Sequence, residues 1–143
     1  MAGFILDYES DMINSNNIIN DIYYPDYILS IPPEVQGAAF IGDRIILSQS
    51  YGRKNNSRIS IYFNPLKAPY YSIFNTEDGR SLPVWILGND NHNMKITAPP
   101  MSEGLTDYKG AVTVLYESGS DKYRSTAKNP QDSIHILNIN IGD

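Results

Sequence analysis

Apolar residues along the chain recur in short alternating runs, separated by Gly, Pro, Asn and Asp. A period of two is typical of strands, because successive strand side chains point to opposite faces of a sheet. The segment 10–24, SDMINSNNIINDIYY, is predicted to be a long loop with at most two helical turns capped by Ser10, because asparagine is a poor helix former. The chain is therefore predicted to be all-β. The ten predicted strands are FILDY (4–8), YILSI (27–31), GAAFI (37–41), RIILSQS (44–50), RISIYF (58–63), YYSIF (70–74), VWIL (84–87), MKITA (94–98), AVTVLYE (111–117) and SIHILNI (133–139).

A nine-position pattern occurs twice without a gap, in LSIPPEVQG (29–37) and ITAPPMSEG (96–104). Ser50 then closes the third run of the first copy and Ser118 that of the second, with one residue inserted. We interpret residues 1–143 as a single domain that contains an internal repeat. Each copy supplies about four strands, with repeat one at about 4–66 and repeat two at about 82–143.

The Pro-Pro pairs have no backbone donors, so they are expected to lie outside the paired strands and to hold the chain extended. Gly37 and Gly104 are expected to allow a close backbone approach or a positive φ. Gln36 and Glu103 precede these glycines, where a strand begins. In a propeller, this position often faces the central channel.

An antiparallel four-stranded unit repeated in sequence is typical of a β-propeller blade. Two blades do not close a ring. The chain would therefore be part of a larger propeller or would complete one by forming a homo-oligomer. The alternative architecture is an open β-sandwich.

The stretches VQGAAFIGDRIILSQSYGR, APPMSEGL and LYESGSDKYR resemble phrases in uncharacterised exported propeller proteins of Gram-positive bacteria. PPMSEGLTDYKGAVTVLYES is more distantly similar to six-bladed propellers of the gluconolactonase and strictosidine-synthase type. The first resemblance implies a bacterial, extracellular or cell-surface location if this chain belongs to an exported protein. The second implies that Glu103 ligates a divalent metal, although Gln36 replaces the acidic residue in the first copy.

The net charge is −5, and the basic residues are scattered rather than gathered into a stripe, which argues against a nucleic-acid partner. No run approaches the roughly 18 apolar residues of a membrane-spanning helix. Cysteine is absent, so disulfides and thiolate metal sites are excluded. These features leave the compartment open.

Two loops that follow strands, SQSYGR (48–53) and ESGSDKYR (117–124), each contain Ser, Tyr and Arg, and such loops are common ligand sites. Their tyrosines and arginines are expected either to bind an anionic or sugar-like ligand or to lock neighbouring blades together. These residues are Tyr51, Arg53, Tyr123 and Arg124.

Two glutamates are the remaining candidates. Glu103 could hold a hard cation such as Ca²⁺ or cap a turn through backbone N–H groups. Glu117 could point inward and pair with Arg53 or Arg124, and it could also bind a ligand. Glu103 and Glu117 are the only carboxylate pair worth testing for glycosidase chemistry.

No complete catalytic motif is present. Gly-x-Ser-x-Gly is absent, and neither His92, predicted to lie in a hairpin loop, nor His135 has zinc-site spacing. Asp78-Gly79 is predicted to be an ordinary turn. We therefore expect a non-catalytic propeller-type module that binds a ligand or serves a structural role. The alternatives are a metal-dependent lactonase-like or esterase-like hydrolase that uses Glu103, and a carbohydrate-binding or carbohydrate-active propeller.

Overall fold

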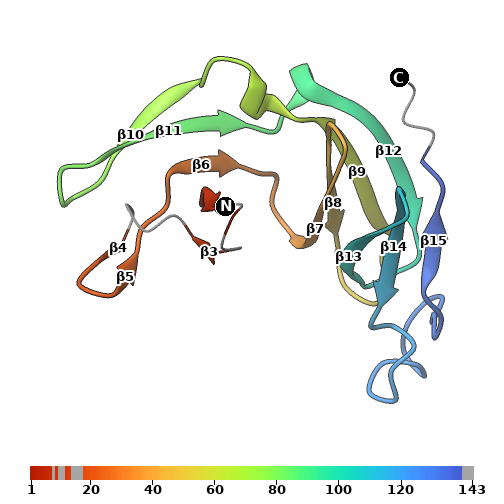
Figure 1. The fold of residues 1–143 in the computed structure, drawn as a ribbon. Coiled ribbons are helices and arrows are strands. Elements are labelled where there is room, and N and C mark those ends of the chain that lie inside the picture. Colours follow the sequence, from red (N-terminus) through yellow and green to blue (C-terminus); the bar gives the residue numbers. More distant parts are fainter. Residues whose placement is uncertain (8, 10–11, 14–17, 140–143) are drawn as a thin grey trace. The chain divides into compact units, whose positions relative to one another are not determined.

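The computed structural model describes residues 1–7, 9, 12–13 and 18–139, and these ranges are all-β, as predicted (Figure 1). They contain no α-helix, only the short 3-10 turns η2 (Pro65–Lys67) and η3 (Asn89–Asn91). The chain forms two compact units, each assembled from two separate segments. Unit 1 comprises Met1–Ile31 and Pro65–Gly88, and unit 2 comprises Pro32–Asn64 and Asn89–Asp143.

Unit 1 is built on a four-stranded sheet in the order β1-β6-β11-β10. Strands β6 and β11 are parallel, whereas the other pairs of this sheet are antiparallel. Two small hairpins, β2-β3 and β4-β5, complete the unit. The bounds are β1 (Ala2–Gly3), β2 (Leu6–Asp7), β3 (Met12–Ile13), β4 (Ile18–Ile19), β5 (Ile22–Tyr23), β6 (Tyr27–Ser30), β10 (Ser72–Asn75) and β11 (Ser81–Ile86).

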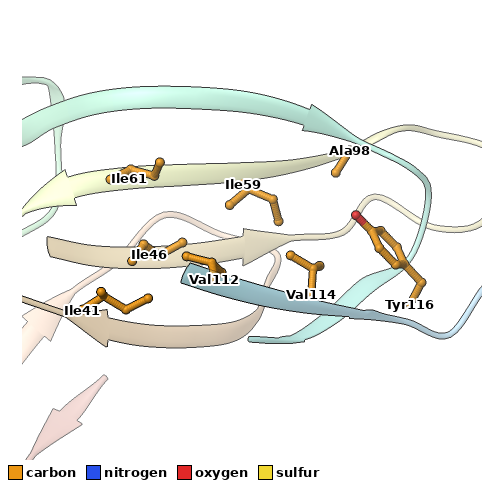
Figure 2. Close-up of a cluster of buried hydrophobic side chains, with 8 residues drawn as sticks. All are labelled: Ile41, Ile46, Ile59, Ile61, Ala98, Val112, Val114 and Tyr116. Atoms are coloured by element: carbon orange, nitrogen blue, oxygen red, sulfur yellow. The ribbon is translucent and has the colours of Figure 1, made fainter. Parts of the chain in front are cut away.

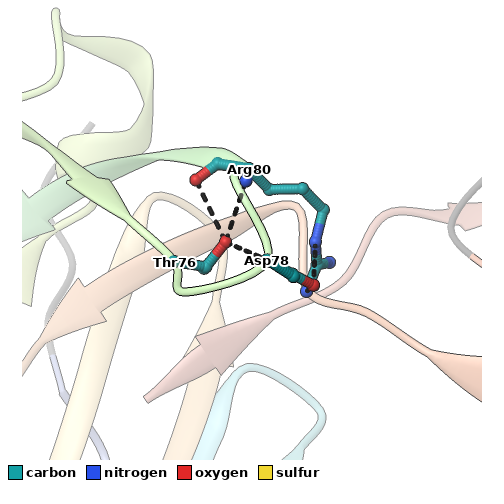
Figure 3. A network of polar contacts seen from close by, with 3 residues as sticks. All are labelled: Thr76, Asp78 and Arg80. Carbon is teal, nitrogen blue, oxygen red and sulfur yellow. Dashed lines mark hydrogen bonds and ion pairs between the residues drawn. The ribbon is translucent and has the colours of Figure 1, made fainter.

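The turn between β10 and β11 is held by a small polar network (Figure 3). The Thr76 hydroxyl accepts a hydrogen bond from the Arg80 backbone N–H at 2.9 Å and also contacts the Asp78 carboxylate. Arg80 Nη2 lies 2.8 Å from Asp78 Oδ2. Gly79 has a φ of 85°. The Asp-Gly turn predicted from the sequence is therefore confirmed.

The prediction for residues 10–24 was wrong where it can be compared. Short strands β3, β4 and β5 replace the expected loop or helical turns, while Ser10 lies outside the described residues. Asn20 and Asp21 have φ values of 51° and 62°, which two-residue hairpin turns require. Asparagine disfavours helix here because it suits the left-handed turn.

Unit 2 contains two antiparallel sheets that share one core. The first has the order β12-β9-β8-β7 and the second the order β13-β14-β15. None of the described sheets closes into a barrel or a propeller. The bounds are β7 (Val35–Ile41), β8 (Arg44–Gln49), β9 (Ser57–Phe63), β12 (His92–Ala98), β13 (Ser102–Tyr108), β14 (Ala111–Tyr116) and β15 (His135–Leu137).

The core of unit 2 lies between these two sheets (Figure 2). Ile46 of β8 and the alternate residues Ile59 and Ile61 of β9 face Val112 and Val114 of β14. These positions are fully or almost fully buried, which is how two sheets packed face to face exclude water. The core residues are Ile41, Ile46, Ile59, Ile61, Ala98, Val112, Val114 and Tyr116.

The internal repeat is visible as two hairpins with matching bounds. Hairpin β7-β8 has strands at 35–41 and 44–49, and hairpin β13-β14 has strands at 102–108 and 111–116, so all four boundaries are related by one constant offset. The two copies therefore align without the one-residue insertion that was inferred from matching Ser50 with Ser118. The structural counterpart of Ser50 is Glu117, because the N–H groups of these two residues donate to the carbonyls of Glu34 and Met101 respectively, both at 3.0 Å.

Each Pro-Pro pair leads into a left-handed residue and then a bulge. Glu34 and Met101, the residues that follow the prolines, have φ values of 62° and 60°. The strand register then shifts between Val35 and Gly37 and again at the equivalent place after Ser102, so Gln36 is an extra residue in its hairpin. In both copies, the prolines and the bulge thus redirect the chain into a hairpin.

The two glycines of the motif have different roles. A Cβ atom on Gly37 would lie 2.2 Å from the backbone oxygen of Glu103, so the close approach predicted there is confirmed. A Cβ on Gly104 would meet nothing within 4 Å, and neither glycine has a positive φ. Only the first copy therefore needs its glycine for packing.

Several strands differ from their predicted bounds. β13 was not predicted as a strand, because SEGLTDY lacks a clear apolar face. β12 begins at His92, which was expected in a loop, and β11 begins at Ser81, ahead of the predicted VWIL. In both cases pairing with a neighbouring strand extends the element, into the polar residues His92 and Asn93 at β12 and through Ser81 to Pro83 at β11.

Formal charge is divided unequally between the units. In the sequence, unit 1 has seven acidic and two basic residues, whereas unit 2 has nine of each. The whole net charge of −5 therefore belongs to unit 1, so an acidic protein can still have a locally basic surface on unit 2.

Candidate functional site

A cleft of about 340 Å³ lies over strands β8, β9 and β12, within unit 2. It is formed on the face of this sheet opposite to the core, since Arg58, Ser60 and Tyr62 alternate along β9 with the core residues Ile59 and Ile61. Its volume is at the lower end of the range usual for small-molecule sites. The lining residues are Pro32, Pro33, Gln49, Tyr51, Arg58, Ser60, Tyr62, Asn89, His92 and Lys95.

Strand register brings the polar side chains of the cleft together. Gln49 of β8 is directly opposite Arg58 of β9, and Ser60 is opposite Lys95 of β12. Directly opposite residues in antiparallel strands project their side chains on the same face, about 5 Å apart. The cleft is therefore assembled by pairing between three strands and not by one loop.

Gln49 is almost completely buried, and its amide is fully hydrogen-bonded. Its Nε2 donates to the Pro33 carbonyl at 2.9 Å and to Tyr51 Oη at 3.2 Å, while its Oε1 accepts from Ser60 Oγ at 3.1 Å. The Pro33 carbonyl can only accept, which fixes the orientation of the amide. Gln49 thus connects the Pro33 backbone, Ser60 of β9 and the Tyr51 side chain through hydrogen bonds.

Two cations, Arg58 and Lys95, line the cleft. Neither forms an ion pair within the part of the chain that the structure describes. Arg58 is partly buried, and its guanidinium carbon lies 5.6 Å from the centre of the Tyr51 ring. No acidic side chain is among the lining residues, so within the described chain the cleft has an excess of positive charge.

Aromatic rings form further parts of the lining. Tyr62 and His92 meet edge to face, with their centroids 5.3 Å apart. Tyr51 follows β8, and its backbone oxygen accepts from Asn55 Nδ2 at 2.8 Å, which holds the loop in place. Together with the two prolines, these rings provide apolar surface beside the cations.

Of the four loop residues predicted to bind a ligand, only Tyr51 is among the residues that line the cleft. Tyr51 lines the cleft, whereas Arg53 Nη1 contacts Thr126 Oγ1 at 3.4 Å, and Arg124 pairs with Asp132 at 3.1 Å. Tyr123 belongs to the same loop as Arg124, where its carbonyl accepts from the N–H groups of Thr126 and Ala127. Binding roles for Arg53, Tyr123 and Arg124 stay predictions.

Glu103 and Glu117 lie near each other at the open end of hairpin β13-β14. Burial is the larger cause that raises the pKa of Glu103 above its ordinary value, and the nearby charge of Glu117 raises it further. Glu117 is exposed rather than inward, and Arg124 pairs with Asp132 instead. Gln36 is exposed at its bulge. Since no ring closes among the described strands, the channel-facing roles of Gln36 and Glu103 also stay predictions.

No group of three or more carboxylate, histidine or cysteine side chains is placed to hold a metal among the described residues. Glu103 and Glu117 would supply only part of the roughly six to eight oxygen ligands that Ca²⁺ takes. A metal role for Glu103 therefore stays a prediction that requires further ligands.

A second cleft of about 310 Å³ lies in unit 1 and contains Arg80. That guanidinium already pairs with Asp78 and lies 3.7 Å from the centre of the Tyr24 ring. Its charge is therefore largely satisfied, which makes this cleft a weaker candidate for a charged ligand.

Five polar residues of the unit 2 cleft were missed from the sequence: Gln49, Arg58, Ser60, His92 and Lys95. The alternation in RISIYF contained a usable signal, because Arg58, Ser60 and Tyr62 must share one face. Placing Gln49 and Lys95 on that face required the pairing register, which the local patterns in these strands do not reveal.

No protein family model, curated protein or solved structure matches this chain. Among the described residues, no helix is long and apolar enough to cross a membrane.

Proposed function

We propose that the chain is a non-catalytic binding module whose unit 2 cleft takes a small anionic ligand. The observation that carries this proposal is the pair of cations, Arg58 and Lys95, in a concave site without an acidic lining residue among those described. A guanidinium presents a planar fork of donors that suits a carboxylate or a phosphate. An anion held between the two cations would gain charge-assisted hydrogen bonds.

We further propose that the two repeated hairpins are blade-like units of a propeller-type assembly, completed by further blades or by other copies of the chain. The constant offset between the hairpins and the repeated Pro-Pro entry support a repeat architecture. A solution mass at a multiple of 16.1 kDa would support self-association, whereas a monomer at micromolar concentration would contradict it.

The anion proposal is tested by titrating the protein with sodium phosphate and with sodium citrate at constant ionic strength, while recording thermal unfolding. An anion at about 100 times its dissociation constant should stabilise the folded protein by about 2.7 kcal/mol. Arg58→Gln should abolish the stabilisation, because it removes the forked donor.

Lys54→Gln is the matched control, since it makes the same charge change at an exposed residue outside the cleft. If Lys54→Gln reduces the stabilisation as much as Arg58→Gln, the anions act on the overall charge of the protein and the proposal is wrong.

A further inference from the structure

We infer that the ligand of the unit 2 cleft is a sugar acid, bound with its carboxylate at Arg58 and Lys95 and with a ring oxygen or hydroxyl at Tyr51. This inference rests on the proposed function, because it specifies the ligand of the same cleft. It is based on the direction of the hydrogen bonds around Gln49 and on the presence of both cations and aromatic rings in the lining of the cleft.

The Tyr51 hydroxyl is set to donate a hydrogen bond into the cleft. Gln49 Nε2 carries two hydrogens, and both are used, one by the Pro33 carbonyl and one by Tyr51 Oη. The tyrosine oxygen is therefore the acceptor in that contact, and its own proton is free for another partner. Ser60 supports this arrangement, because its hydroxyl donates to Gln49 Oε1 and prevents the amide from turning.

The cleft consequently offers mostly donors. The Tyr51 hydroxyl, the Arg58 guanidinium and the Lys95 ammonium can all donate, whereas the amide hydrogens of Gln49 are already used. A complementary ligand must be rich in acceptor oxygens and must carry negative charge. Carboxylates and phosphates both supply the negative charge, and the oxygens of a sugar supply the further acceptors.

The aromatic and proline surfaces favour a sugar over a bare inorganic anion. Pro32, Pro33, Tyr51 and His92 present apolar surface beside the donors, whereas Tyr62 is almost completely buried. Phosphate has no apolar part that would benefit from this surface, whereas the C–H faces of a pyranose ring do. The volume of about 340 Å³ also exceeds what one tetrahedral anion occupies.

The arrangement belongs to the first repeat alone. At the constant offset of the repeat, the counterparts of Gln49 and Tyr51 are Tyr116 and Ser118, both of which are buried. Tyr116 belongs to the core, where its ring lies 4.7 Å from that of His135. The second hairpin therefore cannot form an equivalent cleft, and we expect one sugar-acid site per chain.

The test is an NMR chemical-shift titration of the intact chain with sodium glucuronate and sodium galacturonate. Glucose and galactose serve as neutral probes, and acetate and phosphate as anions without a sugar ring. We expect at least one sugar acid to bind about tenfold more tightly than acetate or phosphate, with neutral sugars weaker still. Tyr51→Phe should weaken sugar-acid binding about tenfold, as expected for one hydrogen bond to a polar or charged group.

Tyr108→Phe is the matched control, because Tyr108 is a tyrosine of unit 2 that lies outside the cleft. If phosphate or acetate binds as tightly as both sugar acids, the sugar inference is wrong while the anion-binding cleft stands. If neutral sugars bind as tightly as the sugar acids, or if no probe shifts the Arg58 and Lys95 signals, the proposed function fails as well. An unchanged affinity in Tyr51→Phe would overturn the donor role of this hydroxyl.

Discussion

Replacing Gly37 by alanine should destabilise unit 2, while the equivalent change at Gly104 should not. The Cβ atom introduced at position 37 would lie 2.2 Å from the Glu103 backbone oxygen, whereas ordinary contact begins at 3.4 Å. That segment of β13 cannot easily move away. The neighbouring Ser102 is buried, its N–H donates to Ser57 Oγ at 3.0 Å, and its carbonyl accepts from Ser48 Oγ at 3.0 Å.

We expect Gly37→Ala to cost about 2 to 3 kcal/mol, the upper part of the range for inserting atoms into packed structure. Gly104→Ala should be neutral or should stabilise the protein by up to about 1 kcal/mol, because its Cβ meets open space and its φ is not left-handed. The two positions have the same place in the repeat, so each variant controls for the other.

Urea denaturation followed by far-UV circular dichroism measures both changes. With an m-value of about 2 kcal/mol per M, a loss of about 2 kcal/mol lowers the midpoint by about 1 M. Trp85, the only tryptophan in the sequence, lies in unit 1, so its fluorescence reports separately on that unit. Equal midpoints for Gly37→Ala and Gly104→Ala would refute the close approach of β7 and β13.

Three further changes test other features of the fold. Glu34→Asn should stabilise the protein by about 0.5 to 1 kcal/mol in the same urea assay, because asparagine tolerates the left-handed conformation at φ 62°, and Glu34→Ala should give no such gain. Ser48→Ala should cost about 1 to 3 kcal/mol, because it leaves the buried Ser102 hydroxyl without its partner at 2.6 Å. If the stability losses of Ser48→Ala and Ser102→Ala add up in the double variant, the two hydroxyls do not interact. The pKa of Glu103 is raised in the folded protein, so the folded state binds a proton at this carboxylate more readily than the unfolded state does. The free energy of unfolding should therefore fall as the pH rises from the ordinary glutamate pKa through the raised pKa of the folded state. Glu103→Gln should therefore gain more in melting temperature relative to the wild type at pH 7 than at pH 4, and an equal gain at both pH values would contradict the shift.

The sequence predicted the strands that have strong apolar alternation. β8 and β9 were placed to within one residue, because Ile45 to Leu47 and Ile59 to Ile61 fill a buried sheet. β13 was missed because its sequence is polar and its strand is held by pairing with β14 and by packing against β7. The repeat nevertheless contained the missing information, since the counterpart of the predicted strand GAAFI (37–41) is the segment 104–108 of β13.

The candidate site was less predictable than the fold. The sequence predicted Tyr51 to be a ligand residue, and the structure places it in the lining of the cleft. The prediction grouped this side chain with Arg53, Tyr123 and Arg124 because the two loops look alike. The cleft depends instead on which residues are opposite one another across β8, β9 and β12. Register across these strands depends on the full hydrophobic pattern and on the geometry of turns and bulges, such as the bulge between His92 and Met94, and a short motif does not determine it.

The interleaving of the two units has a consequence for biosynthesis. β6 ends at Ser30 and pairs with β11, which begins only at Ser81, so the first unit cannot complete its sheet until both its segments have left the ribosome. The hairpin β7-β8 emerges earlier, but its apolar face stays uncovered until β14 has been made. Nascent chains would therefore expose strand edges and isoleucine-rich surface for most of translation, when chaperones and aggregation compete with folding. Expression of residues 1–64 alone should yield neither unit, since each would lack one of its two segments.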